Sequence, residues 1–245
     1  MKTKALFSWS SGKDSALALF KIQQNQEFEI TCLLTSVNEE FQRVSMHGVR
    51  VALLKQQAQN IGLPLQIMQI PEMPSMEAYE SVMNETLTKL KNQGNTHSVF
   101  GDIFLEDLRE YREGQLKKFG IKAIFPLWKT PTKELIQEFI DLGFKTIVVC
   151  VNEQFLDKSF VGRIIDHQFI TDLPENVDVC GENGEFHTFT FDGPIFSKPI
   201  LFEIGQIIYR KYERPKQEES SNTVCDSDTP DVFDFGFWFC DLVEK

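Results

Sequence analysis

The sequence lacks both long apolar runs and closely spaced cysteine pairs. No stretch approaches the roughly 20 apolar residues that a membrane-spanning helix needs, so we expect no membrane partner. The chain has five cysteines, and no two of them have the C-x-x-C spacing. Their arrangement argues against a disulfide framework and against a zinc knuckle. The first apolar stretch is too short for a signal peptide, and we expect a cytoplasmic protein.

Positive charge is also scarce. Lysine and arginine together number 25, aspartate and glutamate number 36, and the net charge is −11. Proteins that bind nucleic acids need a basic surface that neutralises phosphates. We therefore expect no nucleic-acid partner and favour a small molecule or another protein. The 22 phenylalanines supply bulky core material, and 245 residues suffice for one large domain or two modest ones.

Strand and helix patterns alternate through the first half of the chain. Several of the expected strands are apolar throughout, which is typical of a parallel sheet covered on both faces. Strands are expected at 4–9, 29–36, 65–70, 98–103 and 121–125, and helices at 13–24, 51–61, 76–90 and 105–119. We therefore predict an α/β fold with a doubly wound, mostly parallel sheet, and we assign it to a domain at 1–127.

The second part of the chain, 128–245, has a mixed pattern that predicts a smaller α+β C-terminal domain. Its segment 214–230 is rich in Glu, Ser, Asp and Pro, and we expect it to be a mobile surface loop. The expected elements are a helix that begins at Pro131 with Thr130 as its cap, a strand at 144–151, a helix over 161–169, and strands at 186–191, 200–209 and 235–242.

A loop of small residues connects the first strand to the first helix. Small residues let the backbone approach a ligand closely, and the first amides of a helix are unpaired and carry the positive end of its dipole. The cation of Lys13 can bridge phosphate oxygens, and Ser10, Ser11 and Ser15 supply hydroxyl groups. Together these groups predict a site for a pyrophosphate. The alternative is an ordinary strand-to-helix turn with Ser and Asp side chains as caps.

Other candidate residues flank this loop. Ligands of doubly wound sheets bind beyond the carboxyl ends of the strands, where the Gly101-Asp102 step is expected. Asp14 either caps its own helix or helps to position a magnesium ion. Thr35 and Ser36, at the end of the second strand, either contact an adenine ring through their backbone or only pack within the sheet. The candidate nucleotide-binding residues are Ser8, Ser10, Ser11, Gly12, Lys13, Asp14, Ser15, Thr35, Ser36, His47, Gly101 and Asp102.

Two of the expected helices carry further patterns. An apolar stripe at helical spacing is formed by Met76, Tyr79, Met83, Leu87 and Leu90. Arg109, Arg112 and Glu113 share the face of another helix at i, i+3 and i+4 spacing. That face is either solvated and salt-bridged, or it presents an arginine pair to a phosphate or an acidic substrate.

A second dense group of polar residues lies in the second half of the chain. Asn183-Gly184 is a strong signal for a type I′ hairpin turn. Two carboxylates, those of Glu182 and Glu185, and the imidazole of His187 surround it. The group is therefore either a plain turn or a turn that also carries catalytic side chains.

Both groups resemble motifs of known families. The order of Ser8–Ser15 resembles the SGGKDS motif of the PP-loop, or N-type ATP pyrophosphatase, family, with Ser11 in place of the first glycine. It is not a Walker A loop, which needs two glycines at a fixed spacing. Residues 181–188 resemble the GENGEFHT signature of the diphthine–ammonia ligase family, whose amino-terminal half carries the PP-loop. Further short matches to the diphthine–ammonia ligase family lie along the chain in the family's order, at 46–47, 62–65, 101–103, 125–128, 162–163 and 192–194.

The resemblance implies an adenine nucleotide α hydrolase-like domain that binds ATP, followed by a smaller domain that contacts the substrate. The family activity is amidation of the diphthine side chain of translation elongation factor two, with ATP and ammonium as further substrates. A carboxylate would attack the α-phosphorus of ATP and expel pyrophosphate, and ammonia would then displace AMP. Magnesium would offset the growing charge of the pyrophosphate.

Within that scheme, Lys13, Ser10 and Ser15 would hold the departing pyrophosphate. The carboxylates of the second group would bind ammonium and accept its proton, with the amide and imidazole beside them as orienting groups. The candidate catalytic residues are Lys13, Asp14, Glu182, Asn183, Glu185 and His187, and Asp14 is the candidate metal ligand.

Two other functions compete with this ligase. A non-catalytic ATP-binding sensor would need no ammonia site, so the glutamate-rich group argues against it. A PP-loop enzyme that modifies tRNA would favour paired cysteines and a basic surface, and the chain has neither. The sequence leaves open whether the protein forms a homo-oligomer.

Overall fold

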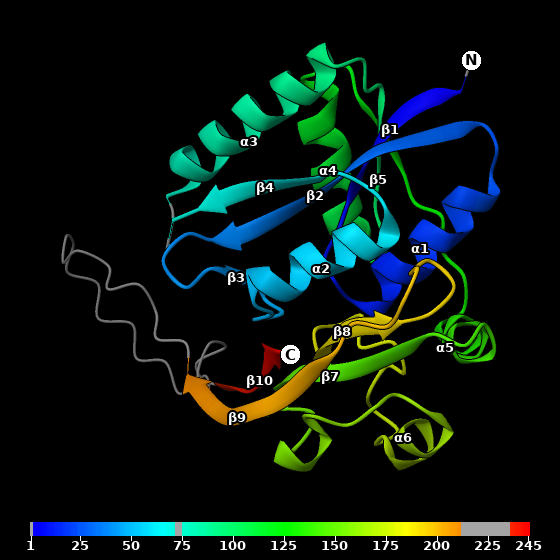
Figure 1. Cartoon of the computed structure of the whole chain (residues 1–245), viewed down its shortest axis with the longest axis vertical. Coiled ribbons are helices and arrows are strands. Elements are labelled where there is room, and N and C mark those ends of the chain that lie inside the picture. The colour runs from blue at the N-terminus through cyan, green and yellow to red at the C-terminus, as the bar shows by residue number, and fades with distance from the viewer. Residues whose placement is uncertain (1, 72–74, 212–235) are drawn as a thin grey trace, which may run out of the picture.

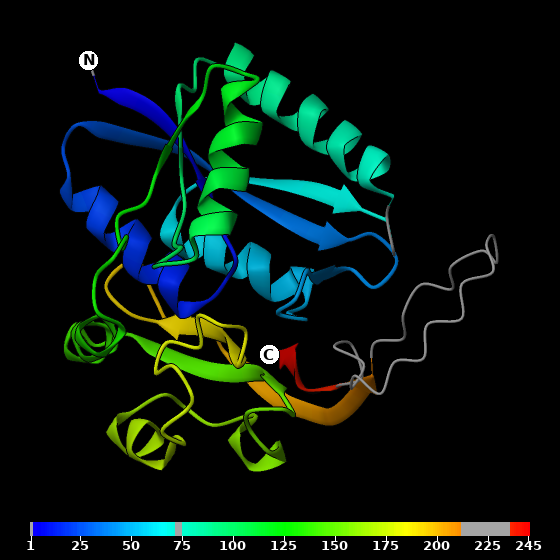
Figure 2. The ribbon, with the colours of Figure 1, turned by 180° about the vertical axis from the view of Figure 1, so that it is seen from behind.

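The computed structural model describes residues 2–71, 75–211 and 236–245, and the predicted mobile loop at 214–230 lies outside them. The described residues form two separate β-sheets, which we call sheet A and sheet B (Figure 1). Helices cover both faces of sheet A, as Figure 2 shows from behind. This arrangement confirms the predicted α/β fold with a mostly parallel sheet.

Sheet A is parallel except at one short strand. Its parallel strands lie in the order β4-β2-β1-β5-β6, and β3 pairs antiparallel with the end of β2. The strands are β1 (Thr3–Ser8), β2 (Phe28–Asn38), β3 (Arg43–Val44), β4 (Leu65–Ile70), β5 (His97–Val99) and β6 (Lys122–Ile124). The two-residue β3 was not predicted, because so short a strand shows no alternation.

One predicted strand is much shorter than expected. The pattern at 98–103 is apolar, but β5 ends at Val99. Beyond it the chain leaves the sheet, and the backbone of Ile103 pairs elsewhere: its carbonyl accepts from the Lys129 amide at 2.7 Å, and its amide donates to the Glu182 carboxylate at 2.7 Å. The segment after β5 therefore builds the site rather than the sheet.

Four helices cover sheet A in two pairs. On one face lie α1 (Lys13–Gln24) and α2 (Val51–Ile61), and on the other lie α3 (Met76–Asn92) and α4 (Glu106–Lys117) (Figures 1 and 2). The chain order of the strands reverses between β1 and β5, so the loops that follow these two strands diverge to opposite faces. Such a reversal opens a crevice beyond the carboxyl ends of the strands, where ligands of doubly wound sheets bind.

Sheet B is antiparallel and packs against the α1 and α2 side. Its strand order is β8-β7-β10-β9, and α1 contacts β8 while α2 contacts β10. The elements of this part are α5 (Thr132–Asp141), β7 (Lys145–Asn152), a 3₁₀ turn η1 (Lys158–Phe160), α6 (His167–Asp172), β8 (Phe186–Asp192), β9 (Phe202–Lys211) and β10 (Gly236–Glu244). Buried apolar side chains form one continuous cluster from sheet A through α1 and α2 to sheet B. The domain boundary at 127 and 128 stays a prediction.

Two helix starts were wrong in detail. Pro131, not Thr130, is the N-cap of α5, and no side chain caps that helix. The helix expected over 161–169 is shorter, because the Asp166 side chain accepts from the Phe169 amide at 2.8 Å and fixes the start of α6 at His167. Val161 and Ile165 are buried, but they belong to irregular backbone that packs on sheet B.

Among the described residues, no helix combines the length and the apolar character that crossing a membrane requires.

Candidate active site

A cleft of about 800 Å³ lies at the carboxyl edge of sheet A. This volume lies within the range of roughly 300–1,000 Å³ that small-molecule sites occupy. The predicted residues that line it are Ser8, Ser10, Lys13, Asp14, Ser15, Thr35, Ser36, His47, Gly101, Asp102, Glu182, Asn183 and His187. Three other predicted residues, Ser11, Gly12 and Glu185, are buried and are not among its lining residues. The structure thus brings the two polar groups of the sequence together in one place.

The N-terminus of α1 forms one wall of the cleft. Gly12 is the N-cap, and the Lys13 amide donates to the Thr188 hydroxyl of β8 at 3.0 Å. The hydroxyl oxygens of Ser10 and Ser15 lie 2.7 Å apart, and the Ser10 amide donates to the Ser15 hydroxyl at 3.2 Å. Because the first turn of a helix has no internal partners for its amides, this wall presents donors and positive potential to an anion.

Ser11 occupies the position where the PP-loop motif has glycine, and its backbone is left-handed. Its φ is 73°, which costs a residue with a Cβ about 1–2 kcal/mol. The Ser11 carbonyl accepts from the Thr190 amide at 3.0 Å and from the Gln57 side chain at 3.0 Å. These two bonds fix the peptide to β8 and α2, so surrounding structure holds the loop in a conformation that its serine disfavours.

Lys13 is buried at the base of the cleft. Its ammonium donates to both carboxylate oxygens of Asp14, at 2.8 and 2.7 Å, and to the Cys180 carbonyl. Burial is the largest single influence and lowers the pKa of Lys13, but the charge and hydrogen bond of Asp14, together with the charges of Cys180 and Glu182, outweigh it, and the net pKa is raised. The side chain therefore carries a fixed positive charge beside the helix N-terminus.

The polar turn that precedes β8 forms the opposite wall. The Gly184 amide donates to the Gly181 carbonyl at 3.2 Å, which closes a turn over four residues. A type I′ turn requires a positive φ at both central residues, and Asn183 is not among the residues with positive φ. The expected type I′ hairpin is therefore wrong. β7 and β8 are joined by a long connection, in which this turn is the last part.

Glu185 holds that turn in place. Its side chain is 1% exposed, and its carboxylate accepts from the amides of Asp178 at 3.0 Å and Asn183 at 2.9 Å, and from the Asn183 side chain at 3.0 Å. Three donors occupy both oxygens. Glu185 and Asn183 therefore fix the shape of the turn. The other carboxylate of the polar turn, that of Glu182, faces the cleft.

Glu182 is that second carboxylate. One of its oxygens accepts from the Ile103 amide at 2.7 Å, which links the turn to the segment after β5. Burial, followed by the negative charge of Asp14, raises the pKa of Glu182 to about 7. A carboxylate with such a pKa changes charge near neutral pH, and this is a property of groups that transfer protons.

Two imidazoles lie against each other at the same wall, with their ring planes tilted by 39°. The ring centroids of His47 and His187 lie 4.8 Å apart, and a hydrogen bond of 2.9 Å joins His47 Nδ1 to the Thr188 carbonyl. Burial lowers the pKa of His47 to about 4, and burial with the neighbouring His47 lowers that of His187 to about 3. Both rings are therefore neutral at pH 7, and they offer hydrogen bonds without adding charge.

The two arginines of α4 have different surroundings. Arg109 pairs with Glu113 at 2.8 Å and lies over the ring of Trp128 at 4.6 Å, so it belongs to a salt-bridged outer face. Arg112 lines the cleft and pairs with Asp102, with a distance of 2.7 Å between Nε and Oδ2. Burial raises the pKa of Asp102, which the charge of Arg112 opposes.

Two residues of the site had no assigned role in the sequence. Thr188 caps α1 although 175 positions separate it from Lys13. Gln57 is fully buried in α2, where it accepts from the Trp9 ring nitrogen at 2.9 Å and donates to the carbonyls of Ser11 and Thr190. The one sequence signal for Gln57 was a polar residue at a core-facing position of an amphipathic helix. No local sequence signal indicated that Thr188 would bind the N-terminus of α1.

Two family models and several curated relatives match this chain. Residues 1–123 match the family described as diphthamide synthase N-terminal domain, and residues 131–215 match the diphthamide synthase C-terminal domain. The diphthine–ammonia ligases of Bos taurus and Homo sapiens are 28% and 26% identical to this chain over 130 residues, which are 51% of this chain and 49% of theirs. That of Schizosaccharomyces pombe is 25% identical over 141 residues, 56% of this chain and 22% of its own length.

This chain thus spans about half the length of the Bos taurus and Homo sapiens relatives. A solved U34-tRNA thiolase from Methanococcus maripaludis is 15% identical, covers 58% of this chain and 57% of its own, and has a TM-score of 0.35, which is too low to support an argument. The two family matches together cover most of the sequence and include both walls of the cleft. The chain therefore belongs to the diphthamide synthase family.

Proposed function

We propose that this protein is an ATP-dependent, AMP-forming amide ligase that adenylates a carboxylate and then amidates it with ammonia. One observation carries the proposal: the N-terminus of α1 and the carboxylate of Glu182 face the same cleft. The first is suited to hold a polyphosphate, and the second is suited to accept a proton near neutral pH. A reaction that expels pyrophosphate and consumes ammonia needs both.

The α1 wall would hold the two outer phosphates of ATP. The hydroxyls of Ser10 and Ser15 and the charge of Lys13 lie where donors to a departing pyrophosphate are needed. Attack by a carboxylate oxygen on the α-phosphorus forms an acyl–phosphate bond and breaks the bond to the pyrophosphate. A free carboxylate has no good leaving group, so this exchange is what makes the later attack by ammonia possible.

The residues of the cleft also fit a magnesium ion that is shared with phosphates. No cluster of three or more His, Cys, Asp or Glu side chains within the described residues could hold a metal alone. Magnesium usually keeps several waters and is bound by one or two carboxylates together with substrate phosphates. Asp14, which lines the cleft, would supply such a carboxylate, and the bound ion would neutralise charge on the pyrophosphate.

Glu182 would prepare the nucleophile. Ammonium has no lone pair, so it must lose a proton before it attacks the activated carbonyl. The ionised carboxylate of Glu182 would bind the cation and take that proton, and ammonia would then displace AMP. The raised pKa of Glu182 makes this transfer easier than it would be to an ordinary carboxylate.

The identity of the proposed acyl substrate is inferred from the relatives. They are named diphthine–ammonia ligases, and on that basis the carboxylate would be that of a diphthine residue. The family resemblance of the sequence suggests translation elongation factor two as the protein that carries this residue. Because the chain spans about half the length of these relatives, we propose this substrate for the reaction and leave out any contribution of their remaining segments.

Product analysis tests the reaction. The protein is incubated with ATP, magnesium, ammonium and a diphthine-containing substrate, and nucleotides are separated by chromatography. We expect AMP and pyrophosphate in equal amounts, with amide formed in proportion. ADP and phosphate as the products would contradict the AMP-forming reaction and leave an ADP-forming enzyme, and ATP that binds without turnover would leave a sensor. Turnover that requires tRNA instead of the diphthine substrate would favour the RNA-modifying alternative.

The pH dependence of the amidation rate is expected to follow the ionisation of the Glu182 carboxylate. Its pKa is about 7, so the proton-accepting form is lost as the pH falls through 7. We expect the amidation rate to rise with pH below about 7 and to level off above it, and Glu182→Gln to reduce it by about 10²- to 10⁴-fold. A pH–rate profile measured at a constant concentration of ammonium ion checks this.

Hydroxylamine separates a chemical role of Glu182 from a structural one. This amine is already uncharged at neutral pH and needs no base, so Glu182→Gln should use it at nearly the wild-type rate. The exposed Glu175→Gln is the matched control and should leave both rates unchanged. If Glu182→Gln were equally slow with both amines, its carboxylate would be needed only to hold the segment after β5.

A further inference from the structure

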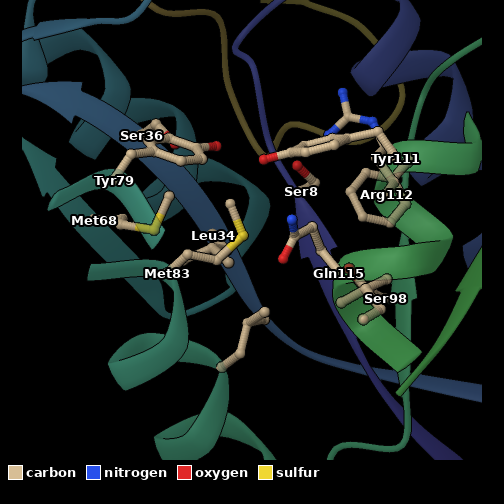
Figure 3. A pocket seen from close by; sticks show the side chains of 13 residues that line it. Ser8, Leu34, Ser36, Met68, Tyr79, Met83, Ser98, Tyr111, Arg112 and Gln115 are labelled. Carbon is tan, nitrogen blue, oxygen red and sulfur yellow. The ribbon is translucent and has the colours of Figure 1, made fainter. Parts of the chain in front are cut away.

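The serine-rich loop before α1 (residues 9–12) has an open side and a buried side. Figure 3 shows Ser8, where the chain leaves β1, on the open side, and there it lines a pocket that α3 and α4 also line. The chain then turns inward, because Trp9 is 1% exposed and Ser11 is fully buried. Groups that lie in the core behind the cleft therefore decide the conformation of the loop.

Ser11 receives no help from its own side chain. Its φ of 73° lies in the left-handed region, which is unfavourable for a residue with a Cβ. A short polar side chain can offset this cost when it forms a hydrogen bond with nearby backbone. The Ser11 hydroxyl is buried, however, and it has no hydrogen-bond partner among the residues that the structure describes. The left-handed peptide must therefore be held from outside, through its carbonyl.

Gln57 supplies the side-chain bond to that carbonyl. Its amide nitrogen donates to the carbonyls of Ser11 at 3.0 Å and Thr190 at 2.7 Å. Its amide oxygen accepts from the ring nitrogen of Trp9 at 2.9 Å. An indole nitrogen can only donate and a carbonyl can only accept, so the orientation of the amide is fixed and both of its hydrogens are used. One buried side chain of α2 thus joins the two ends of the loop to β8.

The geometry of the cleft wall depends on this peptide. Ser11 is followed directly by Gly12, the N-cap of α1. A change of φ at Ser11 would move Ser10 relative to α1 and would break the bond of 3.3 Å that the Gly12 amide donates to the Ser10 hydroxyl. That hydroxyl also lies 2.7 Å from the hydroxyl of Ser15 in the first turn of the helix. Loss of the left-handed form would therefore displace the proposed donors to the polyphosphate.

We propose that Gln57 is a positioning residue that keeps the serine-rich loop in its polyphosphate-binding form, and that this chain depends on it because a serine occupies the left-handed position. This inference rests on the proposed function, because it takes the phosphates to bind at α1. Glycine adopts a positive φ about as readily as a negative one, so a loop with glycine at this position needs little outside support. The Cβ of Ser11 adds a cost that corresponds to a factor of about 5–30 in an equilibrium, and the bond from Gln57 offsets it.

Calorimetric titration with ATP tests the coupling between the two positions in four proteins: the wild type, Gln57→Met, Ser11→Gly and the double variant. Methionine is unbranched like glutamine and has a similar helix propensity, but it cannot donate to the Ser11 carbonyl. The Thr190 amide still bonds that carbonyl, so the loop is loosened and not lost. We expect Gln57→Met to weaken ATP binding by about 5- to 30-fold in the wild-type background and by much less in the Ser11→Gly background.

Two controls accompany the cycle. Ser11→Ala removes the hydroxyl but keeps the Cβ, so in this background Gln57→Met should weaken ATP binding as much as it does with the serine. Gln59→Met changes an exposed glutamine of the same helix, and it should bind ATP as the wild type does. Thermal unfolding checks that each variant is folded at the temperature of the titration. A Gln57→Met protein that folds only in the Ser11→Gly background would also support the coupling.

Three results would overturn the inference and leave the proposed function intact. Gln57→Met that binds ATP as tightly as the wild type would show that the loop keeps its form without this amide. An equal loss in the wild-type and Ser11→Gly backgrounds would show that Gln57 does not act through Ser11. Gln57→Met that folds in neither background would show that the core, and not the loop, requires this side chain. Wild-type protein that binds no ATP would instead remove the proposed function together with the inference.

Discussion

Replacement of Lys13 by methionine is expected to reduce AMP formation by about 10²- to 10³-fold, the loss typical when one donor to a developing negative charge is removed. Lys13 is the buried cation of the cleft wall, and burial fixes its position before the substrate arrives. Methionine keeps the length and most of the volume of the side chain but cannot donate. Quantification of AMP by chromatography measures the effect.

A second readout distinguishes lost charge from lost packing. The charge of Lys13 lowers the pKa of Glu182, so its removal should move the midpoint of the pH–rate profile to higher pH. Lys21→Met is the matched control, because Lys21 lies on the same helix and pairs with Glu138 at the surface at 2.7 Å. Its rate and pH midpoint should match those of the wild type. A Lys13→Met enzyme with an unaltered midpoint and normal AMP formation would remove this side chain from the reaction.

Replacement of Gly101 by alanine is expected to weaken nucleotide binding and activity by about a hundredfold, the scale associated with a displacement of about 1 Å in an active site. A Cβ at this position would lie 2.9 Å from the Ser15 amide nitrogen and 3.0 Å from the Asp14 carbonyl carbon. Both atoms belong to the backbone of the first turn of α1, so neither can move without moving the wall that we propose binds the phosphates. Titration with ATP and the AMP assay measure the loss.

Gly114→Ala supplies the contrast. Gly114 lies inside α4, and a Cβ there meets no atom within 4 Å. Alanine should therefore stabilise the helix by about 0.5–1 kcal/mol and leave ATP binding unchanged. Thermal unfolding measures this gain: for a chain of this size, each kcal/mol raises the melting temperature of Gly114→Ala above that of the wild type by about 2–4 °C. If Gly101→Ala bound ATP normally, the close approach of the segment after β5 to α1 would have no part in holding the nucleotide.

The order of helices and strands could be predicted because it depends on the local spacing of apolar residues. The strand before Ser8 and the helix after Lys13 follow from apolar spacing within a dozen residues. The expected position of Gly101 beside that helix also followed, since parallel strands of one sheet end at the same edge. Errors arose where tertiary contacts replaced local rules: β5 ends early because Ile103 pairs with Lys129 and Glu182.

The sequence by itself determined the doubly wound sheet, the serine-rich loop before α1 and most of the polar residues that meet in the cleft. Only the tertiary structure decided what each of them does, because burial and charge depend on neighbours that are distant in the chain. Glu182 and Glu185 are three positions apart and chemically identical, yet three donors hold Glu185 and the cleft raises the pKa of Glu182. Likewise, no periodicity could place the Thr188 hydroxyl on the first amide of α1, because 175 positions separate the two residues.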